Sequence, residues 1–399
     1  MAIIKAFAAL RPTSDTAESV ACVPYDVISV AEARELARGN PKSFLHIIRP
    51  EIDLDPSIDE YDTAVYLQGA KNLRHFASGE YSHQETEPSL YAYRIRMDEH
   101  EQVGIYGLVS VEEYKRGAIL KHENIRPPKV ADRTRHIVTQ AAHAEPVNLV
   151  FKEHAPVMDL MDACTKTEPL FDFTAEDGIQ HTVWRFADPE RLVEAFEGVD
   201  PIYIADGHHR CEAAWKAWDQ EGASGSDFFP AVCFPAGSTQ ILPYNRVIRV
   251  QNAAKLIQEI DGIGAIQKST AKATPSVRGE VSLYADGAWH TVTLPPTRRS
   301  GVADQLDVAR LGEFVLEPFL GITDQRTDPN ITFVGGIRGT DELVKRVEES
   351  EHSAVAFSMF ATSMDQLLAV SDAHELMPPK STWFEPKLRS GLLIHRFAG

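Results

Sequence analysis

The chain has 399 residues, of which 43% are hydrophobic, and this is enough for two or three packed subdomains. Its formal net charge of −18, from 58 acidic and 40 basic residues, disfavours binding to nucleic acid and to anionic membranes. The four cysteines include no Cys-x-x-Cys pair, and no apolar run reaches the ~18 residues of a membrane span. The N-terminus lacks the pattern of a signal peptide. We therefore expect a cytoplasmic protein with reduced thiols and a small-molecule ligand.

The first half of the chain predicts a mixture of strands and helices. A strand is expected at residues 3–12, helices at Val30–Arg38 and Tyr61–Ser78, and β-structure at 88–120. Pro127 and Pro128 interrupt the polar stretch 121–136, so an extended loop is expected there. A hairpin is expected around 174–186, where turn residues separate two alternating segments.

The second half of the chain also predicts strands that alternate with helices. Strands are expected at 201–205, 228–236, 241–250, 331–336, 353–359 and 391–397, and helices after 207 and at 253–260, 311–321, 340–350 and 363–374. Asp286-Gly287 predicts a two-residue hairpin turn within 281–294. The pattern indicates an α+β (mixed α/β) fold with an irregular mixed sheet. We expect three subdomains, at 1–120, 121–250 and 251–399.

One short motif, "ADGHHR", stands between a buried strand and an apolar helical stripe. A helix start carries backbone N–H groups that attract phosphate, and Gly207 lets the backbone approach a ligand. Arg210 can fork onto phosphate oxygens, and His208 and His209 can donate hydrogen bonds or exchange protons. Asp206 can bind Mg²⁺ together with substrate phosphates. The motif therefore predicts a phosphate-and-metal site.

Two other interpretations of this motif remain open. Asp206 could simply cap the helix, with Arg210 in a salt bridge and the histidines partly buried. A zinc site could use His208, His209 and Cys211, although neighbouring helical side chains do not face one point.

A second polar cluster is "KHENIRPPKVADRTRH". A carboxylate beside a histidine, near several cations, suits a base that works next to bound phosphate. The alternative is a solvated charged loop. The residues that carry the pattern are His122, Glu123, Arg126, Lys129, Asp132, Arg133, Arg135 and His136.

A third motif near the C-terminus, "LMPPKSTWFEPK", places Lys380, Ser381 and Thr382 after two prolines. A lysine followed by hydroxyls is typical of phosphate contacts, but no glycine loop precedes it, so it is not a Walker A motif. A plain proline-rich turn is the alternative. Weaker polar groups within apolar segments occur in "VPYDVIS", "FLHIIRPE" and "LPYNRV".

These motifs together carry a resemblance. "ADGHHR", "LKHE" and "PPKST", in this order, resemble the motifs of free serine kinases in the ParB/sulfiredoxin-like superfamily. With "PYDVIS", "FLHIIRPE" and "LPYNRV", nearly the whole chain resembles a large bacterial family catalogued as a domain of unknown function and linked to phosphorylation of free L-serine. The resemblance implies a ParB/sulfiredoxin-like catalytic core with inserted subdomains.

The resemblance also implies a function, the phosphorylation of L-serine to O-phospho-L-serine with ATP or ADP and Mg²⁺. Two alternatives are a nucleotide-binding regulator and a nucleotide hydrolase. Partners would be L-serine, or a similar hydroxy amino acid, and nucleotide, and the sequence does not choose between a monomer and a homodimer. The implied catalytic residues are Glu123, Asp206, His208 and His209, with Asp206 also the metal ligand. Nucleotide would be held by Gly207, His209, Arg210, Lys380, Ser381 and Thr382, and the acceptor by His122, Arg126, Lys129 and Arg133.

Overall fold

The computed structural model describes residues 3–222, 225–266 and 272–397. Contacts divide the chain into two compact units. The first unit consists of Met1–Lys121, Ile125–Thr239 and Pro386–Gly399, and the second of His122–Asn124 and Gln240–Glu385. The C-terminal segment thus returns to the first unit after the chain has formed the second.

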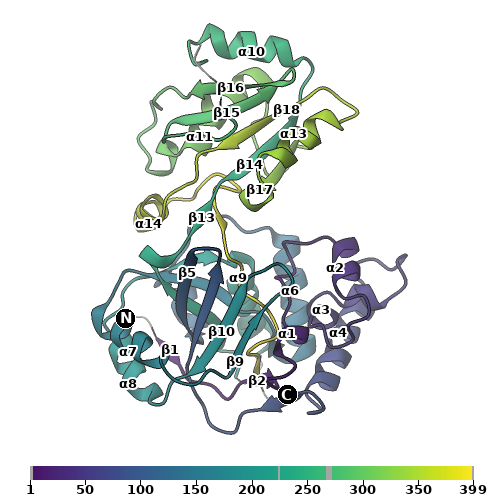
Figure 1. The fold of residues 1–399 in the computed structure, drawn as a ribbon, viewed down its shortest axis with the longest axis vertical. Helices are drawn as coiled ribbons and strands as arrows, with labels where there is room; N and C mark the ends of the chain where they lie inside the picture. Colours follow the sequence, from purple (N-terminus) through teal and green to yellow (C-terminus); the bar gives the residue numbers. More distant parts are fainter. Residues whose placement is uncertain (1–2, 223–224, 267–271, 398–399) are drawn as a thin grey trace. The chain divides into compact units, whose positions relative to one another are not determined.

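The first unit is built around a nine-stranded sheet in the order β6-β11-β8-β12-β5-β4-β10-β9, with β1 also paired to β5. Strands β1, β5, β9 and β10 of this sheet are labelled in Figure 1. β11 is parallel to β6 and β12 is parallel to β8, whereas the other pairs are antiparallel. The mixed sheet confirms the predicted fold class. Its strands are β1 (Ile4–Lys5), β4 (Tyr91–Met97), β5 (His100–Ser110), β6 (Ile119–Leu120), β8 (Val147–Phe151), β9 (Phe171–Thr174), β10 (Gln180–Arg185), β11 (Ile202–Asp206) and β12 (Phe228–Pro235).

Nine α-helices and two small ladders accompany this sheet in the described part of the first unit. The ladders pair β2 (Leu10–Pro12) with β3 (Ser82–Gln84), and β7 (Ala142–His143) with β20 (His395–Arg396). The helices are α1 (Ala17–Val20), α2 (Val30–Leu36), α3 (Leu45–Ile48), α4 (Thr63–Phe76), α5 (Val111–Lys115), α6 (Pro127–Gln140), α7 (Ala155–Cys164), α8 (Pro189–Phe196) and α9 (His208–Glu221).

Two sequence predictions in this unit were wrong. The stretch 121–136 is not an extended loop, because α6 begins at Pro127. Its two prolines occupy the first helical positions, where a backbone N–H has no intrahelical partner and proline's fixed φ suits the helix. Within 88–120, residues after Ser110 form α5 rather than strand, because the Ser110 side chain caps a helix there.

The second unit contains a five-stranded antiparallel sheet in the order β16-β15-β18-β14-β17. Asp286 and Gly287 both have positive φ, which confirms the predicted hairpin turn between β15 and β16. The strands of this unit are β13 (Ile241–Leu242), β14 (Tyr244–Arg249), β15 (Glu280–Ala285), β16 (Ala288–Thr293), β17 (Ile331–Gly335), β18 (Ala354–Met359) and β19 (Trp383–Phe384). The helices are α10 (Ala253–Gly262), α11 (Asp307–Leu311), α12 (Glu317–Leu320), α13 (Asp341–Glu348) and α14 (Met364–Asp372), with a π-helical stretch at Gly312–Leu316.

The core of the first unit fixes the start of α9. Cys211 and Ala214 of α9 are buried in the same hydrophobic cluster as Leu149 of β8 and Ile204 of β11. A second stripe of α9 packs on α6 through a smaller cluster, which includes Val130, Ile137, Ala213, Ala217 and Phe397. Helix α9 is thus held on two sides, and the turn that precedes it has a fixed position within the unit.

All four cysteines are free and buried. Among the described residues, no helix combines the length and the apolar character that a membrane crossing requires.

Candidate functional site

The "ADGHHR" motif forms the turn between β11 and α9, as predicted. Gly207 is the N-cap of α9 and has φ +109°, a conformation that only glycine adopts without strain. A Cβ at this position would lie 3.1 Å from both Arg210 Nε and Val147 Cγ1. The glycine therefore allows the Arg210 guanidinium to lie directly against the backbone of the turn.

Arg210 is buried, with 7% of its surface exposed, and donates to the carbonyl of Pro146. Its Nη2 lies 3.8 Å from Asp206 Oδ2. Burial by itself lowers the pKa of this guanidinium, but nearby carboxylates outweigh burial and raise that pKa. These carboxylates belong to Asp206, Asp26 and Glu145. Arg210 is therefore a permanent buried cation at the start of α9.

Lys387 supplies a second cation at the same turn. It belongs to the C-terminal segment of the first unit, and its Nζ lies 3.2 Å from Asp206 Oδ2. Lys387 is the last residue of the "LMPPKSTWFEPK" motif, whose pattern predicted no role for it. Its contact with Asp206 joins positions 181 residues apart, so only the folded chain could reveal it.

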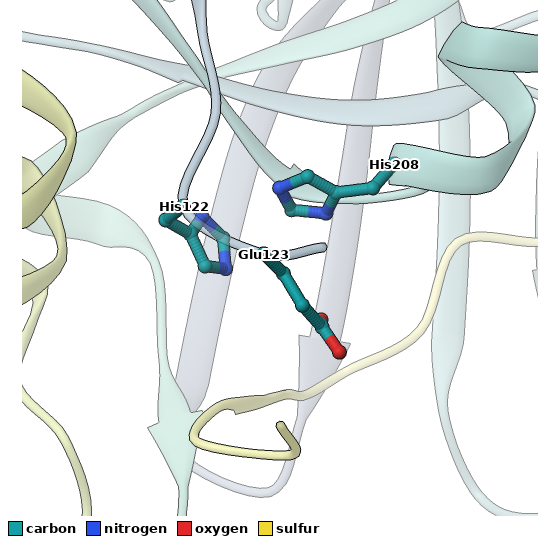
Figure 2. Close-up of side chains that lie close together, drawn as sticks. All are labelled: His122, Glu123 and His208. Atoms are coloured by element: carbon teal, nitrogen blue, oxygen red, sulfur yellow. The ribbon is translucent and has the colours of Figure 1, made fainter. Parts of the chain in front are cut away.

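The starts of helices α6 and α9 meet beside this turn. The backbone N–H of Arg126, the N-cap of α6, donates to His209 Nε2 at 2.9 Å. Nε2 of His209 is thus an acceptor, so a neutral His209 ring carries its proton on Nδ1. His208 is the first residue of α9 (Figure 2), and it is buried. Two helix N-termini converge here, and each contributes a positive partial charge.

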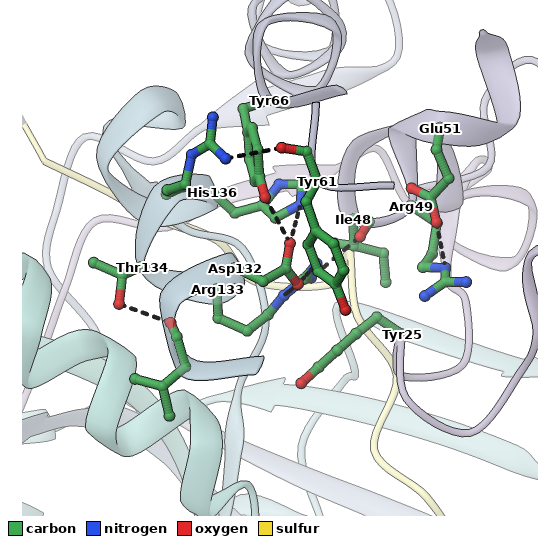
Figure 3. A network of polar contacts seen from close by, with 12 residues as sticks. Tyr25, Ile48, Arg49, Glu51, Tyr61, Tyr66, Asp132, Arg133, Thr134 and His136 are labelled. Atoms are coloured by element: carbon green, nitrogen blue, oxygen red, sulfur yellow. Dashed lines mark hydrogen bonds and ion pairs between the residues drawn. The ribbon is translucent and has the colours of Figure 1, made fainter. Parts of the chain in front are cut away.

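Arg133 forms a buried polar network with α4 and the segment around Tyr25 (Figure 3). Its guanidinium donates to Asp132 Oδ2 at 2.8 and 2.9 Å, to the carbonyl of Ile48 at 3.2 Å and to Glu145 Oε2 at 3.3 Å. It also lies 3.9 Å from the centre of the Tyr25 ring. Tyr66 donates to the other oxygen of Asp132 at 3.0 Å. Arg133 thus has several partners inside the protein, which suits a positioning residue better than an exposed substrate contact.

Glu145 connects this network to the turn. Its side chain is only 8% exposed, and burial raises the pKa of its carboxyl group, whereas Arg133 and Arg210 lower that pKa. It also accepts the backbone N–H of Tyr25 at 3.4 Å. Glu145 was missed in the sequence analysis, and no local pattern around it would have identified it.

The other residues of this unit that were predicted to bind the acceptor substrate are more exposed to solvent than Arg133. The side chain of Arg126 is exposed, and Lys129 is half-buried with its Nζ 5.5 Å from the centre of the Tyr61 ring. Both residues lie in or next to the first turn of α6.

The second unit contains the remaining predicted residues. His122 is buried, and its carbonyl accepts the backbone N–H of Met377 at 2.7 Å. Figure 2 shows the side chains of His122 and Glu123 on the segment that follows β6. The bond to Met377 holds this segment beside the residue that precedes "PPKST". The structure therefore brings two predicted motifs together within the second unit.

The "PPKST" loop is held by a buried arginine. Arg246 donates to the carbonyls of Pro379 and Lys380, at 3.4 and 3.1 Å, and to the carbonyl of Tyr244. Ser381 Oγ donates to the carbonyl of Pro378 at 2.7 Å. Lys380 has φ +57°, which is uncommon for a residue with a side chain. The "LPYNRV" and "PPKST" motifs thus form one local structure.

Lys380 and Thr382 keep partly exposed side chains in this loop, whereas Ser381 is buried. The Nζ of Lys380 lies 5.2 Å from the centre of the Tyr244 ring. Of these three residues, Ser381 thus has a clear structural role, and the other two are accessible to a ligand.

The zinc alternative finds no support at the turn. Cys211 is fully buried, and burial raises the pKa of its thiol to about 12, so it stays protonated at neutral pH. His209 Nε2 already accepts the N–H of Arg126. Neither atom is thus prepared to bind zinc.

Comparison with solved structures gives likenesses of low identity. A free serine kinase in complex with AMP matches with a TM-score of 0.38 and 12% identity, over 72% of this chain and 91% of that chain. A conserved hypothetical protein from Pyrococcus furiosus matches with a TM-score of 0.38 and 13% identity, over 73% and 95%. SbnI from Staphylococcus aureus, truncated at its C-terminus, matches with a TM-score of 0.40 and 12% identity, over 72% and 86%. Likeness at these values does not extend to activity.

Comparison with curated proteins gives no match. The family model described as "Protein of unknown function (DUF1015)" matches residues 4–309, which is more than half of the chain. The chain therefore belongs to the DUF1015 family.

Proposed function

We propose that the chain is a small-molecule kinase that transfers a phosphoryl group from ATP, or ADP, to the hydroxyl of free L-serine. The observation that carries the proposal is the meeting of two helix starts at the Arg126–His209 hydrogen bond, beside the buried cation Arg210. The choice of L-serine phosphorylation as the reaction is based on the resemblance of "ADGHHR", "LKHE" and "PPKST" to the motifs of free serine kinases.

The turn suits a phosphate group. Helix N-termini bind anions through their free N–H groups and their dipoles, and guanidinium groups bind phosphate through two parallel hydrogen bonds. Asp206 at present pairs with Lys387 and Arg210 through Oδ2. A bound phosphate would offer both cations a new partner, so these residues can hold the transferred group.

The same turn fits a magnesium ion. Mg²⁺ prefers oxygen ligands and is commonly held by one or two carboxylates together with substrate phosphates. The Asp206 side chain is 28% exposed at the end of β11, so its carboxylate can take part in such a site. When bound, the ion would neutralise negative charge on the phosphate oxygens.

Glu123 is proposed as the base. In the transfer, the serine hydroxyl oxygen forms a bond to phosphorus, its proton passes to Glu123, and the bond to the leaving nucleotide oxygen breaks. Glu123 stands three residues before Arg126, so extended chain alone keeps their Cα atoms within about 11 Å. His122 would lie near the base. Positioning and electrostatics would supply most of the acceleration.

The remaining residues would bind and orient the two substrates. His208 and His209 would stand at the transferred group, with Gly207 allowing its close approach. Lys380 and Thr382 would contact nucleotide phosphate or acceptor, and Ser381 would hold their loop. The serine carboxylate would be bound by Arg126 or Lys129, with Arg133 supporting α6.

The test is product analysis by mass spectrometry. The purified protein is incubated with Mg²⁺, ATP or ADP, and L-serine, and phosphoserine is measured. We expect Asp206→Ala and Glu123→Ala to lower the rate at least ~10²-fold, because each removes a group that acts at the reacting atoms. The matched controls Asp219→Ala and Glu190→Ala remove exposed carboxylates from α9 and α8 and should retain the activity.

Other outcomes would overturn the proposal. Nucleotide loss that is indifferent to serine would identify a hydrolase. Nucleotide binding without turnover would identify a regulator.

A further inference from the structure

A buried asparagine next to the turn has an unsatisfied oxygen. Asn148 is the second residue of β8, and only 4% of its surface is exposed. Within the described part of the chain, its Oδ1 has no hydrogen-bond partner. Such an atom lowers stability, because its hydration is lost on folding and is not replaced. Buried side-chain oxygens normally have partners, so this exception requires an explanation.

The strand register places Asn148 at the turn. Asp206, the last residue of β11, is the register partner of Asn148 in the antiparallel β8–β11 pair. The pairing shifts by one residue between Ile204 and Asp206, which brings Asp206 opposite Asn148. Directly opposed residues of an antiparallel pair have their side chains on the same face of the sheet. The register therefore places Asn148 and Asp206 at opposed positions on the same face of the sheet.

The rest of β8 shows that this polar position is not part of the main core. Val147, Leu149 and Phe151 alternate with Asn148 along the strand and belong to the large hydrophobic cluster. Side chains alternate between the two faces of a strand, so Asn148 faces away from that cluster.

A second buried asparagine, Asn245, has a structural role and serves as a comparison for Asn148. Asn245 of β14 is 2% exposed, and its Oδ1 accepts the backbone N–H of Met359 at 2.9 Å. Its oxygen is satisfied by the fold itself. The two residues share the same chemistry and similar burial, and they differ in whether the folded chain supplies a donor.

We propose that Asn148 Oδ1 is a second protein ligand, beside Asp206, for the divalent cation at the start of α9. This inference rests on the proposed function, in which Asp206 and phosphate oxygens hold Mg²⁺. Carboxylate and carboxamide oxygens are hard ligands of the type that Mg²⁺ prefers. Asp206 and Asn148 would hold the ion from the protein side, and the ion would neutralise negative charge on the phosphate oxygens. The lone pairs of Asn148 Oδ1, which accept no hydrogen bond within the described chain, would then bind the metal ion and not stabilise the fold.

The experiment measures metal binding directly, with Mn²⁺ as a paramagnetic probe in place of Mg²⁺. Free Mn²⁺ is followed by electron paramagnetic resonance while the full chain is titrated in the presence of ADP. We expect Asn148→Ala to raise the Mn²⁺ dissociation constant about 10-fold or more, because changes around a metal site commonly cost 10–100-fold in affinity. Asn148→Asp retains an oxygen and adds a charge, so it should bind Mn²⁺ at least as tightly as wild type.

Two controls separate a ligand from a structural residue. ADP binding in EDTA should be the same in wild type and Asn148→Ala, because Asn148 acts through the metal. The melting temperature of Asn148→Ala should be equal to or above that of wild type, since an unsatisfied group is removed. Asn245→Ala should lower the melting temperature, because it removes a satisfied buried acceptor.

The outcomes distinguish this inference from the proposed function. If wild type binds Mn²⁺ through Asn148 but makes no phosphoserine, the function fails and the inference stands. If Asn148→Ala binds Mn²⁺ as tightly as wild type, the inference is overturned even when phosphoserine forms. An equal loss of ADP affinity with and without metal would also overturn it, because Asn148 would then contact the nucleotide itself.

Discussion

Each unit of the chain contains a buried arginine, Arg210 in the first and Arg246 in the second, and the two differ in what surrounds the guanidinium. Arg210 lies among the carboxylates of Asp206, Asp26 and Glu145, which raise its pKa against the effect of burial. The bonds of Arg246 go to the carbonyls of Tyr244, Pro379 and Lys380, and burial lowers its pKa to about 10.

We interpret this difference as one between the proposed binding site at Arg210 and a structural support at Arg246. At Arg210, two of the three neighbouring acids have other cations, since Asp206 also contacts Lys387 and Glu145 also contacts Arg133, and the third, Asp26, is exposed. An anionic ligand could therefore take over Arg210 without leaving a buried charge alone. Arg246 instead satisfies neutral carbonyls of a loop, and no ligand is needed to explain its charge. Both arginines remain cationic at neutral pH, but only the first stands where helix starts attract an anion.

The largest expected effect is on the stability of the second unit. Arg246→Met removes charge-assisted hydrogen bonds and leaves buried carbonyls without a donor, so the free energy of unfolding should fall by about 3 kcal/mol. Urea unfolding followed by tryptophan fluorescence measures this, because Trp289 and Trp383 lie in the second unit. The control Arg346→Met removes a partly exposed arginine paired with Glu342 and should cost about 0.5 kcal/mol or less. Equal losses in the two variants would contradict the supporting role of Arg246.

The second expected effect is on nucleotide binding by the first unit. Arg210→Met should weaken ATP or ADP binding about 10- to 100-fold, since a charge-assisted hydrogen bond contributes roughly 1.5–3 kcal/mol. Isothermal titration calorimetry gives the affinity, and Arg96→Met, at an exposed pair with Glu101, is the matched control. We expect a smaller loss of stability than in Arg246→Met, because Asp206 and Glu145 keep other cations. If the affinity is unchanged, Arg210 does not bind nucleotide, and the proposed difference in role between the two arginines is wrong.

The smallest expected effect is on the pH dependence of stability, and it concerns His143, a buried group that stays neutral where the two arginines are charged. Burial, followed by the effect of His395, lowers the pKa of His143 to about 3. The unfolded chain binds this proton below about pH 6.5, whereas the folded chain does so only near pH 3. The stability that neutral His143 contributes is thus complete above pH 6.5 and is lost as pH falls toward 3. By pH 5.5, this loss lowers the free energy of unfolding by about 1.4 kcal/mol.

The measurement compares unfolding free energies at pH 7 and pH 5.5. His143→Phe keeps an aromatic ring beside His395 and Phe397 and should show a drop smaller by about this amount. His136 and His181 also have lowered pKa values, chiefly through burial, so part of the drop should persist in the variant. An identical drop in wild type and variant would show that His143 does not contribute to acid sensitivity.

Local sequence patterns predicted much of the secondary structure near the site. The apolar run before Asp206 and the apolar stripe after Gly207 predicted β11 and α9 correctly. The prediction failed at Pro127 and Pro128, because a proline pair that breaks a helix interior also suits a helix start, and periodicity alone does not distinguish these positions.

By itself, the sequence determined the chemistry available at the turn: an acid, a glycine that lets the backbone approach a ligand, two histidines and an arginine at a helix start. These features depend on neighbouring residues and on turn chemistry, which local sequence specifies. Only the tertiary structure decided which distant groups meet them. Asn148 reaches Asp206 through the register of β8 on β11, and Lys387 reaches it through the return of the C-terminal segment. Strand register and chain return depend on burial across the whole unit, so no local pattern encodes them.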